Sequence, residues 1–176
     1  MIVDDNYLSA EGIEKNIDWE TLNAEIIHVC YNGTSAIEAM KKEPADLIIS
    51  DIEMPDLDGI SMSRQALEIN PMVKIILISA YDKFEYARRA LLLGALDYIE
   101  KPLDYAYLIQ KVKNAFALME KEQKNLQLLK QSRPLLTEKF FREITHLPSS
   151  EAAYRLKPYL KYLNLELNYD FYTVVI

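Results

Sequence analysis

Short apolar runs that each end in a polar residue are the feature of this sequence that most constrains its fold. Runs of this length are typical of buried β-strands. If the strands are parallel, their carboxyl ends meet at one edge of the sheet, where open α/β sheets bind ligands. We therefore expect the residues that follow the runs to share one pocket. The runs cover residues 1–3, 47–50, 75–78 and 98–100, and the residues that follow them are Asp4, Asp5, Asp51, Ser79 and Lys101.

Segments of helical length alternate with these runs, and a further β run lies at 24–30. This alternation predicts an α/β fold in which helices cover both faces of a parallel sheet. Five strands and five helices fit within about the first 119 residues. Helices are expected at 7–16, 35–42 and 82–93, and the last two open with the capping-box pairs Ser35/Glu38 and Asp82/Glu85.

The helical pattern that begins at Leu103 continues well past what a closing helix needs. It carries apolar residues at roughly heptad spacing. Two interpretations remain open: the helix projects as a linker, or it packs along its whole length on its own domain. In either case we expect Pro134 to break it. The apolar residues of this seam are Val112, Ala115, Met119, Leu126 and Leu129.

Beyond Pro134 the sequence suggests helices at 135–144 and 149–162 and a strand at 169–176. Two helices and a lone strand make a thin core, which predicts the start of an incomplete second domain. The expected domains are therefore 1–119, a helical linker at 120–133, and the second domain at 134–176.

Composition excludes several classes of protein. Half of the 176 residues are apolar, which predicts a folded chain, and the formal net charge of -7 disfavours nonspecific binding to DNA. A single cysteine, Cys30, excludes an internal disulfide and favours a reducing, cytoplasmic setting. The longest apolar runs are much shorter than the ~20 residues that span a bilayer.

The three aspartates of the expected pocket predict a divalent cation. Crowded carboxylates repel one another, so they must raise a pKa or bind a positive ion. Mg²⁺ prefers oxygen ligands and keeps several waters. We expect Asp5 and Asp51 to bind Mg²⁺ directly and Asp4 to act through water.

With such an ion in place, Asp51 is a candidate nucleophile toward phosphorus, Lys101 a second positive charge, and Ser79 a hydroxyl donor to a phosphoryl oxygen. Each residue alone has an ordinary explanation. Asp4 or Asp5 suits a helix N-cap, Ser79 a turn, and Lys101 a surface lysine. Their joint placement at successive strand ends favours a phosphoryl-transfer site.

These residues resemble the receiver domain of two-component response regulators over about residues 1–119. The resemblance implies a flavodoxin-like, CheY-like fold with a doubly wound five-stranded sheet. The family pattern is carried by Asp4-Asp5, Asp51 followed by Met54-Pro55 and Asp58-Gly59, Ser79-Ala80, and Tyr98 before Lys101-Pro102.

The resemblance also implies roles for individual residues. Asp51 would accept a phosphoryl group from a sensor histidine kinase, and the Glu53 carbonyl would be a further metal ligand. The Lys101-Pro102 peptide would be cis, a configuration open to X-Pro bonds. Ser79 and Tyr98 would form a switch that alters an output face, and so dimerisation, through helix 82–93, strand 96–99 and helix 103–119.

Further segments resemble the YesN-like branch, whose regulators carry an AraC-type helix-turn-helix domain. Such a domain is not found in these residues, so any transcriptional control through DNA would belong to a missing part. The segments that carry this likeness are 17–20, 80–87 and 138–142.

Two other functions compete with a phospho-accepting receiver. A phosphatase of the haloacid dehalogenase type also uses an aspartyl phosphate, and Asp51-Ile52-Glu53 imitates its paired acids. However, Asp51 follows the third expected strand, and Met54 takes the place of a small or β-branched residue. A pseudo-receiver would keep the fold without phosphorylation, and the full set of site residues argues against it.

Overall fold

A five-stranded parallel sheet forms the centre of the protein. The computed structural model describes residues 1–80 and 84–144. The strand order is β2-β1-β3-β4-β5, which is the order of flavodoxin-like doubly wound folds, so the predicted fold class is confirmed. The strands are β1 (Ile2–Val3), β2 (Val29–Cys30), β3 (Leu47–Asp51), β4 (Lys74–Ser79) and β5 (Asp97–Glu100).

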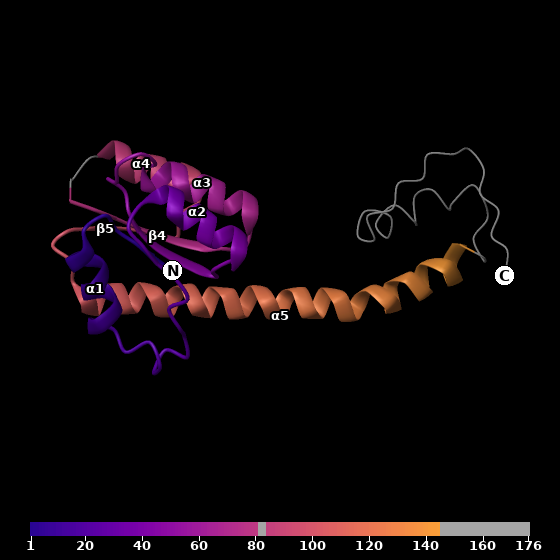
Figure 1. Cartoon of the computed structure of the whole chain (residues 1–176). Helices are drawn as coiled ribbons and strands as arrows, with labels where there is room; N and C mark the ends of the chain where they lie inside the picture. The colour runs from indigo at the N-terminus through magenta and orange to yellow at the C-terminus, as the bar shows by residue number, and fades with distance from the viewer. Residues whose placement is uncertain (81–83, 145–176) are drawn as a thin grey trace. The chain divides into compact units, whose positions relative to one another are not determined.

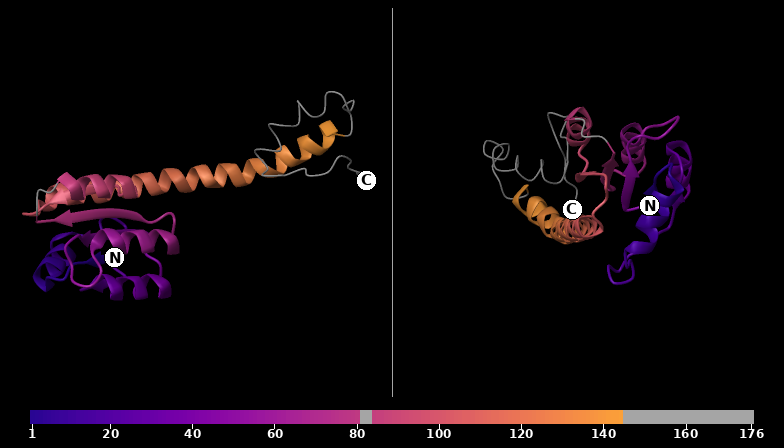
Figure 2. Two further views of the ribbon diagram at one scale, coloured as in Figure 1. Left: turned by 90° about the horizontal axis from the view of Figure 1, so that it is seen from above. Right: turned by 90° about the vertical axis from the view of Figure 1, so that its left-hand side faces the viewer.

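Helices cover both faces of this sheet. Figure 1 shows α2, α3 and α4 on one face, with α1 and the first turns of α5 on the other. The right view of Figure 2 shows the strand arrows between these two layers. The helices are α1 (Tyr7–Asn16), α2 (Gly33–Lys42), α3 (Gly59–Ile69), α4 (Phe84–Leu93) and α5 (Tyr105–Ile144).

The central strands β3 and β4 carry most of the core. Because helices pack on both of their faces, these strands are apolar almost throughout rather than alternating. Ile48, Ile76 and Leu77 are fully buried. The buried polar residues of the two strands lie at their ends: Ser50 and Asp51 close β3, and Ser79 closes β4.

The helix starts follow local capping. Asn32, not Ser35, caps α2, and its side-chain oxygen accepts a hydrogen bond from the Ser35 backbone N at 2.8 Å. The predicted Ser35 cap is therefore wrong, because an asparagine three residues before the predicted start caps the helix at least as well. Asp104 caps α5 in the same way. The predicted Asp82 cap of α4 lies outside the described residues.

The second strand is shorter than predicted. Only Val29–Cys30 pairs, although the β pattern covers 24–30. The reason is the partner: β2 is an edge strand whose neighbour β1 has only two paired residues, Ile2 and Val3. The hydrogen-bonded ladder between β1 and β2 therefore ends after two residue pairs.

The last helix is continuous through Pro134, so the predicted break at this proline is wrong. A proline inside a helix removes one backbone hydrogen bond, and the flanking turns here retain the helix. Val112 and Ala115 are fully buried, whereas Leu126 is 49% exposed, so the predicted seam is not one uniform surface.

Internal contacts divide the chain into two units, Met1–Leu118 and Met119–Ile176. The first unit holds the whole sheet and the first turns of α5. The helix predicted at 135–144 falls within α5. The helix predicted at 149–162 and the strand at 169–176 lie outside the described residues.

The start of α5 should contribute to the stability of the first unit. Leu108 is fully buried, and Leu108→Ala should lower the free energy of unfolding by about 2–4 kcal/mol because it leaves a cavity. Leu8 on α1 is 74% exposed and serves as the control, since Leu8→Ala should change stability by less than about 0.5 kcal/mol. Equal losses in urea unfolding would contradict this assignment.

Candidate functional site

The polar residues predicted from the strand ends come together at one edge of the sheet. Asp4 follows β1, Asp51 ends β3, Ser79 ends β4, and Lys101 follows β5. Because all five strands are parallel, these ends point the same way.

The acidic part of the site consists of Asp4, Asp5 and Asp51. One carboxylate oxygen from each of the three lies within 4.8 Å of those of the other two. Asp4 and Asp51 are buried, while Asp5 is exposed. The backbone N of Asn6 donates to Asp4 Oδ1 at 2.9 Å, which fixes the Asp4 carboxylate. The cluster is therefore open to solvent on the side of Asp5.

Lys101 is the basic residue of this cluster. Its Nζ lies 3.0 Å from Asp4 Oδ2 and 3.4 Å from Asp51 Oδ2. Burial lowers the pKa of Lys101, but the hydrogen bond and charge of Asp4, with the charge of Asp51, outweigh it and raise the pKa overall. Lys101 thus stays positively charged and bridges the two buried aspartates.

The ionised form of the Asp51 carboxyl is destabilised by its surroundings. Burial raises its pKa to about 6, the charge of Asp4 adds to this effect, and the charge of Lys101 opposes it. Among the described residues, Asp51 Oδ1 is buried without any hydrogen-bond partner. A buried carboxylate oxygen without a partner is costly.

This donor set fits a divalent cation. Three aspartates face one lysine, so the cluster has an excess of negative charge. The unpaired Asp51 Oδ1 is a free oxygen ligand, and oxygen ligands are those that Mg²⁺ prefers. The exposure of Asp5 leaves room for the waters that Mg²⁺ retains.

Ser79 and Tyr98 lie on neighbouring strands beside this cluster. Ser79 is fully buried, and its backbone carbonyl accepts a hydrogen bond from the Lys101 backbone N at 2.8 Å. Tyr98 is half-buried and packs against the core. The Lys101-Pro102 peptide is cis, which is the configuration that the resemblance implies.

The loop after β3 is fixed by the start of α3. Asp58 caps this helix and accepts hydrogen bonds from the backbone N of Ile60 and of Ser61, both at 2.9 Å. A side chain at Gly59 would collide with the backbone carbonyl of Asp51, so only glycine fits there. This close approach holds the loop against the strand that carries Asp51.

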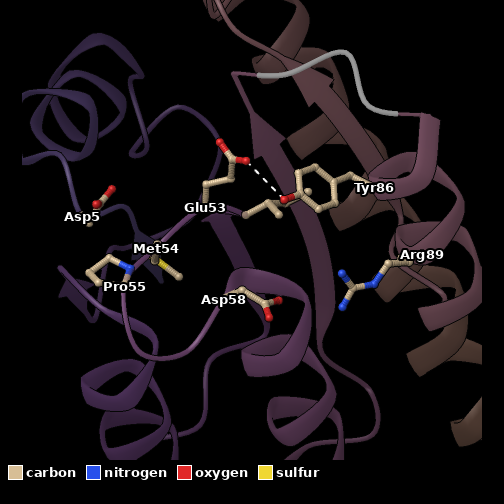
Figure 3. Close-up of a pocket in the computed structure, with 8 residues that line it drawn as sticks. Asp5, Glu53, Met54, Pro55, Asp58, Tyr86 and Arg89 are labelled. Atoms are coloured by element: carbon tan, nitrogen blue, oxygen red, sulfur yellow. Dashed lines mark hydrogen bonds between the residues drawn. The ribbon is translucent and has the colours of Figure 1, made fainter.

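A cavity of about 420 Å³ adjoins the site between this loop and α4. Figure 3 shows Glu53 facing Tyr86 across it, and the Tyr86 hydroxyl donates to Glu53 Oε1 at 3.2 Å. Sequence patterns do not predict Tyr86 or Arg89 as site residues. On an amphipathic helix, a tyrosine ordinarily packs against the core and an arginine ordinarily faces solvent. The lining residues are Asp5, Ile52, Glu53, Met54, Pro55, Asp58, Tyr86 and Arg89.

The sequence profile of the response regulator receiver domain matches residues 1–113. The chain belongs to this family. Residues 1–113 are therefore a receiver domain of a two-component response regulator. This identity, together with the position of Asp51 at the end of β3, gives the phosphatase alternative no support.

Curated relatives of this receiver are transcriptional regulators. YesN of Bacillus subtilis, an uncharacterized transcriptional regulatory protein, is 28% identical over 122 residues, which are 69% of this chain and 33% of YesN. HptR of Staphylococcus aureus is 30% identical over 108 residues, which are 61% of this chain and 42% of HptR. The chain thus spans less than half the length of either relative.

Solved receiver structures share the fold. The receiver domain of AraT, a response regulator from Geobacillus stearothermophilus, has 34% identity and a TM-score of 0.66 over 69% of this chain and 95% of that one. The two component transcriptional regulator AraC from Clostridium phytofermentans has 31% identity and a TM-score of 0.63, over 70% and 95%.

A third similar structure contains ligands. It is the CheX-CheY-BeF3-Mg²⁺ complex from Borrelia burgdorferi, with 30% identity and a TM-score of 0.60 over 65% of this chain and 86% of that one. In the part of this chain that the structure describes, no helix is both long and apolar enough to cross a membrane.

The stability of the metal-free receiver should depend on the ionisation of Asp51. Its pKa in the folded chain is about 6, above the usual ~3.9 of an unfolded chain, so folding loses stability as the pH rises through this interval. We therefore compare the free energy of unfolding of Asp51→Asn with that of the parent chain in EDTA. Between pH ~4 and pH ~7 this difference should shift by about 2 kcal/mol in favour of Asp51→Asn, because only the parent loses stability as Asp51 ionises.

Urea unfolding of both proteins across this pH range measures the difference. Asp56→Asn is the matched control, because Asp56 is exposed in the same loop and asparagine tolerates its positive φ of 66°. A stability difference between Asp51→Asn and the parent that stays constant with pH would contradict the prediction.

Proposed function

We propose that this receiver accepts a phosphoryl group on Asp51 from a sensor histidine kinase in a Mg²⁺-dependent reaction. The observation that supports it best is the buried Asp51 carboxylate, whose Oδ1 has no partner among the described residues. A structural carboxylate in this position would be expected to have its hydrogen bonds satisfied. A nucleophile needs a free oxygen.

Asp4, Asp5, Asp51 and the backbone carbonyl of Glu53 would hold the ion. When bound, Mg²⁺ would offset the negative charge of the carboxylates and of the incoming phosphoryl group. Asp4 keeps its hydrogen bond from the Asn6 backbone N and so stays in place.

In the transfer step, an Asp51 carboxylate oxygen forms a bond to phosphorus while the phosphorus–nitrogen bond of the kinase's phosphohistidine breaks. The electron pair of the broken bond stays on the imidazole. Lys101, whose Nζ is 3.4 Å from Asp51 Oδ2, is positioned to pair with a phosphoryl oxygen. The Ser79 hydroxyl would donate to another. The receiver thus assists its own phosphorylation and later hydrolysis, as a signalling domain rather than as an enzyme of turnover.

Ser79 and Tyr98 would carry the change outward. Ser79 ends β4 and Tyr98 lies on the adjacent β5, so a movement of Ser79 reaches the strand that Tyr98 occupies. Repacking there would alter the face formed by α4, β5 and the start of α5, which we propose as a dimerisation surface. Packed surfaces of this kind tend to have discrete alternative states.

The output would be transcriptional control by a longer protein. The similar YesN and HptR are transcriptional regulators, and this chain matches 33% and 42% of their lengths. We propose that an AraC-type DNA-binding domain outside these residues contacts DNA. The DNA-binding domain would be joined to the receiver at 1–119 through the proposed linker at 120–133 and the proposed second domain at 134–176. We propose that the whole protein acts in the cytoplasm.

Incubation with Mg²⁺ and acetyl phosphate should add one phosphoryl group to the parent chain and none to Asp51→Asn. Intact mass spectrometry measures the adduct, and EDTA should abolish it. Asp56→Asn, in the same loop, should be phosphorylated as the parent is. No adduct on the parent would favour the pseudo-receiver, and an equal yield on Asp51→Asn would exclude Asp51 as the acceptor.

Beryllofluoride with Mg²⁺, which mimics a bound phosphoryl group, should shift the receiver from monomer toward dimer in light scattering. Exposed apolar residues on the proposed surface supply the driving force, because Leu91 and Leu92 on α4 are 77% and 78% exposed. Leu8→Ala on α1 should leave the shift intact. An unchanged mass would remove the dimerisation proposal and leave phosphorylation unaffected.

A further inference from the structure

A hydrogen bond joins α4 to the loop that follows the phosphorylation site. The Tyr86 hydroxyl in the first turn of α4 donates to Glu53 Oε1 at 3.2 Å, across 33 positions of sequence. The contact is partly buried and lies on the wall of the 420 Å³ cavity, where Figure 3 shows the Glu53 carboxylate directed toward the tyrosine.

This bond helps to hold a fourth carboxylate in its position. Glu53 is two residues beyond Asp51, and its side chain lines the same cavity as Asp5. Nevertheless, in the described residues the group of three acids whose oxygens all lie within 4.8 Å of one another consists of Asp4, Asp5 and Asp51, without Glu53. Glutamate has three rotatable side-chain bonds, so its position depends on the partners that hold it.

The position of Glu53 has electrostatic consequences for the site. A carboxylate that joins the three aspartates would add negative charge next to a bound cation and next to an incoming phosphoryl group. The cation would bind more tightly, and the anionic donor would meet more repulsion. Holding Glu53 on the α4 side avoids both effects.

We propose that Tyr86 is a positioning residue that keeps the Glu53 carboxylate out of the aspartate cluster and so leaves the site accessible to an anionic phosphodonor. This inference rests on the proposed phosphorylation of Asp51. Tyr86 acts through Glu53 and touches neither the ion nor the phosphoryl group.

Tyr86→Phe tests the hydroxyl alone, because the ring is half-buried against the core and phenylalanine retains its packing. The variant should bind Mg²⁺ a few-fold more tightly and should lower the efficiency of phosphorylation by acetyl phosphate roughly three- to tenfold. Opposite signs for the two measurements are the mark of an electrostatic role, since damage to the site would weaken both.

The Glu53→Gln background shows whether the effect passes through Glu53. Without the charge, the added Tyr86→Phe change should alter neither Mg²⁺ affinity nor phosphorylation efficiency. Tyr31→Phe, which removes a hydroxyl from a ring that is 44% exposed, is the control and should match the parent. Equal effects of Tyr86→Phe in both backgrounds, or no effect in the parent, would overturn the proposal.

The two measurements separate this inference from the proposed function. If the parent chain takes up no phosphoryl group, the proposed function fails, and Mg²⁺ titration of the parent and these variants still decides the role of Tyr86. If the parent is phosphorylated but Tyr86→Phe leaves Mg²⁺ affinity unchanged, the role of Tyr86 fails while the proposed function stands.

Discussion

Two aspartates buried beside a single lysine are the constraint on which this site depends. Asp4 and Asp51 are 1% and 7% exposed, and both contact Lys101. Lys101 satisfies part of their charge, but Asp51 Oδ1 has no partner among the described residues and the pKa of Asp51 is raised to about 6. The fold therefore keeps a destabilised carboxylate, and such groups concentrate at functional sites. In the proposed function, a bound cation would reduce the cost of this buried charge.

The sheet makes this arrangement possible. Strand β3 is buried along its whole length and β4 from Ile75 onward, and each places its final polar residue at the same edge. Hydrophobic packing of the strands and their helices outweighs the cost of burying Asp51 and Ser79. The glycine that follows the α3 cap lets the loop after Asp51 lie against its own strand.

Much of the fold and of the cluster could be predicted from the sequence, because four of the five strands are short apolar runs that are followed by a polar residue. The length of β2 could not be predicted because it is limited by β1, a partner far away in sequence, whereas the start of α2 was wrong for a local reason, a competing cap at Asn32. The bond between Tyr86 and Glu53 could not be predicted, because it depends on how α4 packs against the loop after β3. The spacing of apolar residues in the sequence does not predict that contact.

The proposal that Asp51 is the phosphoryl acceptor is tested most directly by trapping the acyl phosphate with borohydride. Reduction converts an aspartyl phosphate to homoserine, which peptide mass spectrometry assigns to a position in the sequence. After reaction with a phosphorylated histidine kinase or acetyl phosphate and Mg²⁺, we predict homoserine at position 51 and at no other aspartate. Homoserine at Asp4 or Asp5, or a phosphorylated chain with Asp51 unchanged, would contradict the account.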